Sequence, residues 1–390
     1  MKLDFVEYCE DEGKPSEWRL DGCQLGDINL IVGKNAFGKS RILKAINLIS
    51  NLLSGETDLE ADGKLREWKL IFDFDKDGQQ KVYILKVENG QVVREIFSIG
   101  NRNLLDRKES GEGIVWAEKL NINMEFQTPT DGVAIFKRRD SIQHPQFEEI
   151  YNWANLLRYY EFGTELGKGF LGSIKAESKN LDLKDTDQVV NIFISGQKEL
   201  GVNFIKAIKS DMLTIGYNIS NIETKSPGAF LFGEDDEIPM KLQCLYVQEN
   251  DLKTKTEQGL ISQGMFRALS LIIQVNYSLL AKKPSCILID DIGEGLDFER
   301  SSAIIKLLIN KAQTGLVQLI MTTNDSFIMN GVPLDYWSVI ERKPGLAKLH
   351  NIHNSQQIFE DFKFIGLNNF DFFETQFYLK GFDNEENIEE

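Results

Sequence analysis

Cysteine and histidine are scarce in this chain of 390 residues, and neither occurs in a metal-binding pattern. The four cysteines are far apart and form no C-x-x-C pair, and there are only three histidines. These residues are Cys9, Cys23, Cys244, Cys286, His144, His350 and His353. The pattern argues against structural zinc and against a disulfide framework, and it indicates a reducing compartment.

An excess of basic residues and a long apolar run are also missing. The chain has 44 Lys and Arg residues and 60 Asp and Glu residues, which gives a net charge of −16. This charge disfavours general electrostatic binding to DNA. A local contact with DNA through the small basic cluster at 137–139 stays open. We interpret the acidic residues at 234–237 as part of a solvent-exposed loop, and those at 383–390 as a solvent-exposed tail that keeps the chain soluble. No apolar stretch reaches membrane-spanning length, and the N-terminus lacks the apolar core of a signal peptide. We therefore expect a soluble, cytoplasmic protein with no membrane partner.

The chain does contain a strand, a glycine loop and a helix in consecutive order. The apolar run Ile28 to Val32 precedes the loop, and apolar residues at helical spacing follow it. The loop and the residue after it are Gly33, Lys34, Asn35, Ala36, Phe37, Gly38, Lys39, Ser40 and Arg41. Glycines let backbone N–H groups turn around an anion, and the helix N-terminus adds its positive dipole end. This is the pattern of a phosphate-binding loop, in which Lys39 reaches the β- and γ-phosphates of ATP and Ser40 binds Mg²⁺.

A second candidate element is the apolar run Cys286 to Ile289, which ends in two carboxylates. After a buried parallel strand, Asp290 is placed to hold Mg²⁺ and Asp291 to polarise the attacking water. A lone apolar run ending in Asp-Asp is weak by itself, but it gains weight beside a phosphate-binding loop in the same chain.

The pattern of elements changes along the chain. Residues 1–136 favour hairpins, with an antiparallel meander at 69–75, 81–87 and 92–99 and turns at Asp77-Gly78, Asn89-Gly90 and Asp131-Gly132. Residues 146–208 are helical in pattern, with one stripe from Phe147 to Tyr160 and another at 189–208. A strand pair is predicted at 212–219 and 241–247.

The last third alternates between helix and strand. Helices are predicted at 262–280 and 299–312, and strands at 286–290, 316–322 and 336–341. Such alternation favours an α/β fold with a mostly parallel sheet. No internal repeat and no sustained heptad run occurs, so a long coiled coil is not expected. We expect one domain, 1–390, with lobes at about 1–145, 146–280 and 281–390.

Three further motifs carry a family resemblance. Ser262, Gly264 and Arg267 resemble the S-x-G-x-x-R signature of ABC-type ATPases, Gly295-Leu296-Asp297 resembles their D-loop, and 322–325 occupies their switch position. With the first two elements, these motifs follow the family order from residue 30 to 326. The chain resembles the superfamily that includes transporter ATPases, SMC proteins and RecF, and is most similar to prokaryotic AAA-family or OLD-like ATPases, many of which act in anti-phage defence.

The resemblance implies an ABC-type P-loop fold and a homodimer. In these ATPases two nucleotide sites form between two protomers, so Ser262 and the amides around Gly264 would cap the γ-phosphate held by the partner's Lys39. The D-loop residue Asp297 would belong to the same composite site. ATP then holds the dimer together, and hydrolysis releases it.

The chain departs from this family at two positions. Most relatives have Glu where Asp291 stands and His where Asn324 stands, so we expect slow hydrolysis with Lys39, Asp291 and Asn324 as the catalytic residues. Asp291 is one methylene shorter than Glu, and a displacement of about 1 Å can reduce a rate on the order of 10²-fold. Glu294 is an alternative carboxylate. Gln143 is the candidate for the Q-loop glutamine near the metal, with Gln146 as its alternative.

These motifs favour an ATPase that regulates a separate effector, a nuclease or a toxin, in bacterial defence. No nuclease constellation occurs in the same chain, and the aromatic segment 356–382 is interpreted as core packing. A RecF-like DNA-repair ATPase and a non-hydrolysing, nucleotide-dependent scaffold are the alternatives.

Overall fold

The computed structural model describes residues 1–72, 79–173, 181–228, 242–283 and 285–382. The predicted turn Asp77-Gly78, the acidic residues 234–237 and the acidic tail 383–390 lie outside these ranges. The chain divides into two compact units. Unit 1 comprises Met1–Leu157 and Pro333–Glu390, and unit 2 comprises Arg158–Val332.

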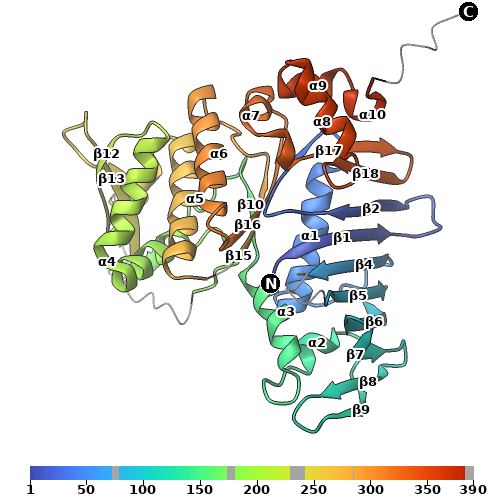
Figure 1. Ribbon diagram of the computed structural model, residues 1–390. Coiled ribbons are helices and arrows are strands. Elements are labelled where there is room, and N and C mark those ends of the chain that lie inside the picture. Colours follow the sequence, from blue (N-terminus) through green and yellow to red (C-terminus); the bar gives the residue numbers. More distant parts are fainter. Residues whose placement is uncertain (73–78, 174–180, 229–241, 284, 383–390) are drawn as a thin grey trace, which may run out of the picture. The chain divides into compact units, whose positions relative to one another are not determined.

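Unit 1 is built on one sheet with the strand order β3-β17-β18-β2-β1-β4-β5-β6-β7-β8-β9 (Figure 1). The strands are β1 (Leu3–Glu10), β2 (Trp18–Gln24), β3 (Ile28–Val32), β4 (Leu65–Phe72), β5 (Lys81–Glu88), β6 (Gln91–Ile99), β7 (Arg102–Arg107), β8 (Glu112–Ala117), β9 (Ile122–Gln127), β17 (Trp337–Lys343) and β18 (Leu346–Asn351). The pairs β3–β17 and β18–β2 are parallel. From β2 through β1 and β4 to β9 every pair is antiparallel, which confirms the predicted meander.

Helices cover one face of the antiparallel strands of unit 1. They are α1 (Lys39–Ser54), α2 (Ala134–Lys137) and α3 (Pro145–Leu156). Trp68 of β4 donates from Nε1 to the carbonyl of Ala45 in α1 at 3.0 Å, and Phe72 packs edge-on against Trp153 of α3 at 4.8 Å. The apolar residues predicted to lie on one side of α1, from Ile42 to Ile49, are buried.

Unit 1 ends in short helices packed around an aromatic cluster. They are α8 (Gln356–Ile365), α9 (Asn369–Glu374) and α10 (Phe377–Lys380), and a 3-10 turn, η3 (Leu334–Tyr336), precedes β17. Phe372 lies at the centre of the cluster, 4.6 Å from Phe359 and 5.0 Å from Phe362 between ring centroids. The predicted core packing of this segment is confirmed for these rings, whereas Phe364 is 88% exposed.

Unit 2 contains three parallel strands in the order β10-β15-β16 and a separate small sheet with the order β11-β13-β12, to which β14 is paired. The strands are β10 (Arg158–Glu161), β11 (Gly172–Ser173), β12 (Ile219–Lys225), β13 (Leu242–Glu249), β14 (Thr256–Glu257), β15 (Ser285–Asp290) and β16 (Val317–Thr323). The helices are α4 (Val189–Thr214), η2 (Gln258–Leu260), α5 (Gln263–Leu280), α6 (Phe298–Ala312) and α7 (Ser326–Gly331). The predicted alternation of helix and strand from 262 onward is confirmed.

Two predictions for this region were wrong. The helix α3 ends at Leu156, and Tyr160 lies on β10, where its hydroxyl donates to Gln274 Oε1 at 3.0 Å. The segment from 212 does not begin a strand but continues α4 to Thr214. After it, Gly216 adopts the left-handed conformation with φ 86°, and the amide of Tyr217 bonds back to the carbonyl of Met212 at 2.8 Å. That bond closes a helix C-terminus, and the strand begins only at Ile219.

No helix in the described part of the chain is both long and apolar enough to cross a membrane. The longest helix of the described residues, α4, has 26 residues and is interrupted at Gly201, where φ is 59° and ψ is −139°. A long coiled coil is therefore absent from the described residues.

Candidate functional site

The glycine loop of unit 1 connects β3 directly to α1. Gly33 lies so close to β17 that a Cβ atom there would be 2.0 Å from Ile340 Cγ2, which explains a glycine at this position. Ala36 and Gly38 have φ values of 63° and 107°, and Gly38 is the N-cap of α1. Left-handed residues beside a helix N-terminus turn successive N–H groups toward one concave space, the geometry that binds phosphate.

The basic residues of the loop differ in their surroundings. The ammonium of Lys39 is buried and donates to the carbonyls of Gly33 at 2.7 Å and Lys34 at 3.3 Å, so it lies within the curve of the loop. Ser40 is half-buried one residue into α1. The guanidinium of Arg41 lies over the ring of Trp18 and pairs with Glu10 at 3.0 Å. Arg41 is thus directed toward β1 and β2, a contact that the sequence pattern did not predict.

In unit 2, the carboxyl ends of three parallel strands bring together polar side chains. Asp290 at the end of β15 is buried, and its Oδ1 accepts a hydrogen bond of 2.6 Å from the hydroxyl of Thr322 on β16. Its Oδ2 is 3.4 Å from the hydroxyl of Tyr159 on β10, which also lies 3.3 Å from Glu161. Burial, followed by the charges of Asp290 and Glu161, raises the pKa of Tyr159 well above its ordinary value. The tyrosine hydroxyl therefore stays protonated and acts as a donor to these carboxylates.

Asp291 begins the turn after β15 in a conformation that is uncommon for a residue with a side chain. Its φ is 50°, its amide donates to the Thr322 hydroxyl at 2.9 Å, and its Oδ1 accepts from Asn324 Nδ2 at 3.1 Å. Left-handed backbone at a non-glycine residue has to be held by its surroundings, and such residues cluster at functional sites. A cavity of about 330 Å³ opens here, lined by residues 291–296 and 323–325.

The residues of the signature and D-loop motifs are helix caps in unit 2. The Ser262 hydroxyl accepts from the amide of Met265 at 3.4 Å at the start of α5, and Gly264 lies against the carbonyl of Gly295. Asp297 caps α6, accepting from the Arg300 amide at 3.0 Å. This hydrogen bond, together with the Arg300 guanidinium, holds the pKa of Asp297 below its ordinary value.

Gln143 lies beside the β8–β9 hairpin of unit 1. The main-chain carbonyl of Gln143 accepts from the main-chain N–H of Glu118 at 2.8 Å, and the main-chain N–H of Gln143 donates to the Asp140 carboxylate at 3.1 Å. The next residue, His144, bonds through Nδ1 to the carbonyl of Trp116 at 2.9 Å, which is a structural role. The contacts of Gln143 do not include residues 33–41, so the structure does not bring this predicted metal-associated residue to the glycine loop.

Sequence reasoning missed Tyr159 and Glu161. Both lie on β10, and Glu161 stands opposite Asp290 in the parallel register. They were missed because the apolar spacing from Phe147 to Tyr160 was interpreted as one helix. The signal that could have found them is the short run of alternating side chains at 157–162, which follows the last helical turn.

The donor set fits Mg²⁺ bound together with a nucleotide better than a metal held by protein alone. Among the described residues, no three His, Cys, Asp or Glu side chains are grouped closely enough to hold a metal ion. Magnesium is usually bound by one or two carboxylates plus substrate phosphates and water. A single buried carboxylate, Asp290, oriented by a neighbouring hydroxyl, is consistent with that mode.

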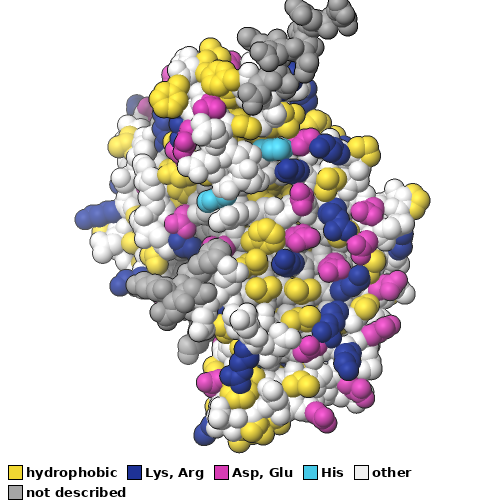
Figure 2. Space-filling view, turned by 45° about the vertical axis from the view of Figure 1, so that its right-hand side comes forward, with side chains coloured by type: hydrophobic (Ala, Val, Ile, Leu, Met, Phe, Trp, Pro, Cys, Tyr) yellow, Lys and Arg dark blue, Asp and Glu magenta, His cyan; other side chains and the backbone are white. Residues whose placement is uncertain are grey.

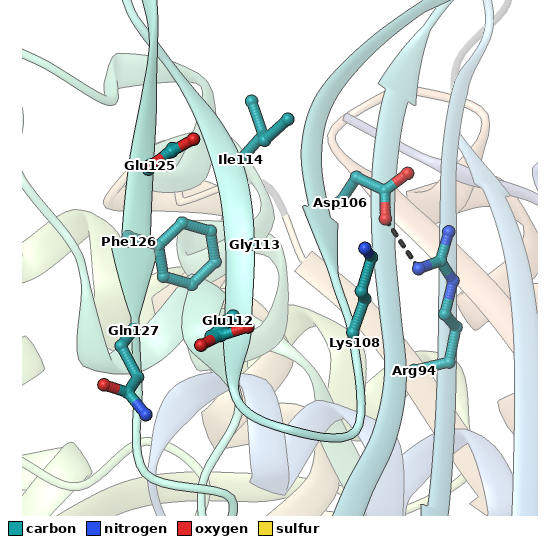
Figure 3. A pocket seen from close by; sticks show the side chains of 9 residues that line it. All are labelled: Arg94, Asp106, Lys108, Glu112, Gly113, Ile114, Glu125, Phe126 and Gln127. Atoms are coloured by element: carbon teal, nitrogen blue, oxygen red, sulfur yellow. Dashed lines mark ion pairs between the residues drawn. The ribbon is translucent and has the colours of Figure 1, made fainter.

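Unit 1 contains a larger cavity, of about 700 Å³ (Figure 3). It is lined by side chains of β6 to β9 and the turns between them, and it carries charges of both signs. Arg94 pairs with Asp106 at 2.7 Å, and Phe126 lies beside Gly113 (Figure 3). None of the predicted nucleotide-binding residues lines this cavity.

The fold is that of a P-loop ATPase domain of the ABC type. A family model described as "AAA domain, putative AbiEii toxin, Type IV TA system" matches residues 28–330, and the chain belongs to this family. Among curated protein sequences, none matches this chain.

Two solved structures of SMC head domains are similar in fold to this chain. One is an SMC head bound to the C-winged helix domain of ScpA, with a TM-score of 0.52 and 14% identity over 90% of this chain and 97% of that one. Another is an SMC head domain from Pyrococcus furiosus with an extended coiled coil, bound to the C-terminal domain of ScpA. Its TM-score is 0.50, with 13% identity over 93% of this chain and 99% of that one. At such identities the likeness concerns the fold alone.

Proposed function

We propose that this protein binds ATP with Mg²⁺, hydrolyses it slowly, and uses ATP binding to join two copies of itself and thereby regulate a separate effector. The observation that carries the proposal is the arrangement at the ends of β15 and β16. There one carboxylate is oriented by a hydroxyl, and the next is held by the amide of Asn324 in a strained turn.

Nucleotide binding is assigned to the glycine loop. The left-handed backbone at Ala36 and Gly38 beside the start of α1, together with the buried Lys39 ammonium, favours a polyphosphate. The motif pattern assigns Mg²⁺ binding to Ser40 in the loop and, separately, to Asp290 at the end of β15. Mg²⁺, when bound, neutralises phosphate charge and helps to orient the groups. Thr322 keeps the Asp290 carboxylate in one orientation, and Tyr159 adds a protonated donor beside it.

Hydrolysis is assigned to Asp291, with Asn324 as its positioning partner. A carboxylate can accept a proton from an attacking water only if it is held in the right direction, and the bond of 3.1 Å from Asn324 Nδ2 supplies that direction. The short side chain of Asp291 restricts how far the carboxylate can reach. Slow turnover is the expected consequence, suited to a switch that stays in its ATP-bound form.

The dimer and the effector follow from the motifs and from the relatives. Ser262 and Gly264 stand at the N-terminus of α5, and in ABC-type ATPases this helix end faces the nucleotide of the other protomer. The two SMC heads above are bound to parts of ScpA, which supports a protein partner here as well. The family description names a toxin system, and this motivates a nuclease or toxin effector in anti-phage defence.

Phosphate release from ATP tests the enzymatic part. We expect slow release by the wild type, and release below detection in Lys39→Ala and Asp291→Asn. Lys44→Ala, which changes an exposed lysine of α1 outside the loop, serves as the matched control and should keep the wild-type rate. Release that persists in Lys39→Ala would contradict the proposal. ATP binding without any release by the wild type would favour the scaffold alternative, which the strained Asp291 also motivates.

A further inference from the structure

Strand β9 lies at one end of the sheet of unit 1 (Figure 1), and its outer edge has no neighbouring strand among the described residues. On its inner side β9 pairs with β8 over its whole length. The amide of Thr128 donates to the carbonyl of Gly111 at 2.9 Å, which shows which residues bond toward β8. In an antiparallel pair every second residue bonds inward, so Asn123, Glu125 and Gln127 direct their N–H and C=O groups to the outer edge.

This edge lacks the features that usually protect an edge strand. Neither proline nor lysine occurs in β9, its register with β8 is unbroken, and Ile122 and Met124 are 50% and 36% exposed. The Arg138 guanidinium lies 3.5 Å from the carbonyl of Gln127, so only the far end is partly covered. An edge without prolines, lysines or bulges is a template for another strand. The open part of β9 is therefore suited to strand addition.

The cavity of about 700 Å³ adjoins this edge (Figure 3). Glu125 and Gln127 of β9 line it, together with Glu112 and the half-exposed Ile114 of β8. These four side chains share one face of the sheet, because Glu112 pairs with Gln127 and Ile114 pairs with Glu125. A strand added to β9 would place every second side chain on this face, over the cavity.

The cavity is acidic on the side of the open edge. Arg94 and Asp106 neutralise each other at 2.7 Å, and Lys108 lies on the β7 side (Figure 3). The carboxylates nearest the edge are those of Glu112 and Glu125. Both side chains are exposed, and within the described ranges neither forms an ion pair. Opposite charges on neighbouring strands stabilise a sheet, so basic side chains of an incoming strand fit this face.

The other face of the edge favours apolar side chains. Ile122 and Met124 alternate with Asn123 and Glu125 along β9, so they lie on the face opposite the cavity. A second copy of this chain fits the edge less well, because it would bring Glu112 and Glu125 of two acidic chains onto one face. A partner strand that alternates basic and apolar residues matches both faces.

We propose that the outer edge of β9 is the docking site of a protein partner, which adds an extended segment of alternating basic and apolar residues to the sheet. The backbone of this segment pairs with Asn123 and Glu125. Its basic side chains lie over the cavity beside Glu112, and its apolar side chains contact Ile122 and Met124. The site belongs to unit 1, includes none of the predicted nucleotide-binding residues and does not require ATP.

Fluorescence anisotropy with a labelled heptapeptide that alternates lysine and valine tests the inference in four proteins without ATP. They are wild type, Asn123→Pro, Glu125→Lys and the control Glu88→Lys, which changes an exposed glutamate of β5 outside the cavity. Asn123→Pro removes an outward N–H and leaves the pairing with β8 intact, so we expect binding to weaken by about tenfold or more. Glu125→Lys turns an opposite-charge pair into a like-charge pair and should weaken binding by about tenfold. Glu88→Lys should bind as wild type does.

Two further measurements separate strand addition from general electrostatic attraction. The same peptide methylated at its backbone nitrogens keeps its charge but cannot pair with a strand, and it should not bind. Hydrogen exchange followed by mass spectrometry should slow in the fragment that contains β9 when the unmethylated peptide is bound, and should not change in β5.

No binding by the wild type, equal binding of the methylated peptide, or unchanged exchange in β9 overturns the inference. A wild type that dimerises without ATP, and an Asn123→Pro protein that does not, would assign the edge to a second copy instead. Should Asn123→Pro fail to fold, as judged by thermal denaturation, Glu125→Lys and the methylated peptide decide. Because binding is measured without ATP, its failure and the failure of the proposed function are distinguishable.

Discussion

The side chains of Asp291 and Asn324 are hydrogen-bonded to each other, and both residues depart from the ABC pattern. Sequence comparison with the ABC pattern marked each of them as a departure, but it could not reveal that the amide donates to the carboxylate at 3.1 Å. The contact depends on the left-handed backbone of Asp291 and on the hydroxyl of Thr322, which bonds to its amide. Neither feature has a signal in the residue pattern.

Replacing Asn324 by Ala should therefore lower the maximal rate of ATP hydrolysis without weakening ATP binding. The carboxylate loses its orientation, and a misdirected catalytic group reduces a rate by about 10- to 100-fold. Steady-state kinetics should show this loss with KM changed less than about threefold. Asn123→Ala, which alters an exposed amide on β9, is the matched control and should leave both constants unchanged. An Asn324→Ala enzyme with wild-type turnover would refute the positioning role.

Glu10 predicts an acid-dependent stability in unit 1. Its carboxylate is shared by Lys64 at 2.6 Å and Arg41 at 3.0 Å. Burial opposes the charged form, but the hydrogen bonds from Lys64 and Arg41 outweigh it and lower the pKa of Glu10 below its ordinary value. Because the folded pKa lies below the unfolded one, the stabilisation is fully present above about pH 4.3 and is lost as the pH falls through the folded value.

Thermal denaturation of wild type and Glu10→Gln between pH 3 and pH 7 measures this contribution. We expect the difference in Tm between the two proteins to be largest at neutral pH and to shrink below about pH 4. Glu109→Gln, a variant of an exposed glutamate, should follow the wild-type curve. A difference in Tm that is constant over this range would contradict the assignment.

At the scale of elements, the sequence predicted the strands of the meander more reliably than it predicted β10. Turn dipeptides and alternating side chains delimit β5 and β6, and both strands are found close to the expected bounds. By contrast, β10 has only four residues and directly follows a helix with the same apolar character. Its identity comes from pairing with β15, a contact between residues far apart in sequence.

The antiparallel strands also contain a buried ion pair that the sequence did not suggest. Glu95 on β6 and Arg107 on β7 are both fully buried, 3.2 Å apart. Glu95 accepts from the amides of Ala134 and Ile135, and Arg107 donates to the carbonyls of residues 128, 129 and 132. These hydrogen bonds attach the segment before α2, and the start of α2 itself, to the sheet.

Arg107→Ala should destabilise the protein by about 3 to 5 kcal/mol, because it leaves a buried carboxylate without its partner. Chemical denaturation measures the change. Arg94→Ala removes a neighbouring, more exposed arginine that pairs with Asp106, and should change the stability by no more than about 1 kcal/mol. Equal effects of the two substitutions would show that burial does not decide the energetics of these pairs.

At the scale of the whole molecule, the surface charge argues against the DNA-binding alternative. On the face drawn in Figure 2, basic and acidic side chains alternate without a large area of one sign. Many of the lysines and arginines of unit 1 are paired, as Lys86 is with Glu67 at 3.1 Å and Lys81 with Glu149 at 2.6 Å. Within the basic cluster at 137–139, Arg139 is bonded to Glu148 at 3.0 Å.

We therefore expect no ATP-dependent DNA binding at physiological salt. Filter binding of a labelled duplex at about 50 mM and 200 mM salt, with and without ATP, checks this. Proteins that contact many phosphates lose about 10³- to 10⁵-fold in affinity over that range. Tight, salt-dependent binding that requires ATP would instead favour a RecF-like function.

The central claim is that ATP joins two copies of this chain. Light scattering coupled to gel filtration measures it most directly, using Asp291→Asn with ATP and Mg²⁺ so that hydrolysis does not release the dimer. We expect a mass of twice the 44.5-kDa chain with ATP, and the mass of one chain without ATP or in an Asp291→Asn protein that also carries Lys39→Ala. A mass of one chain at saturating ATP in Asp291→Asn would show that ATP does not join two copies.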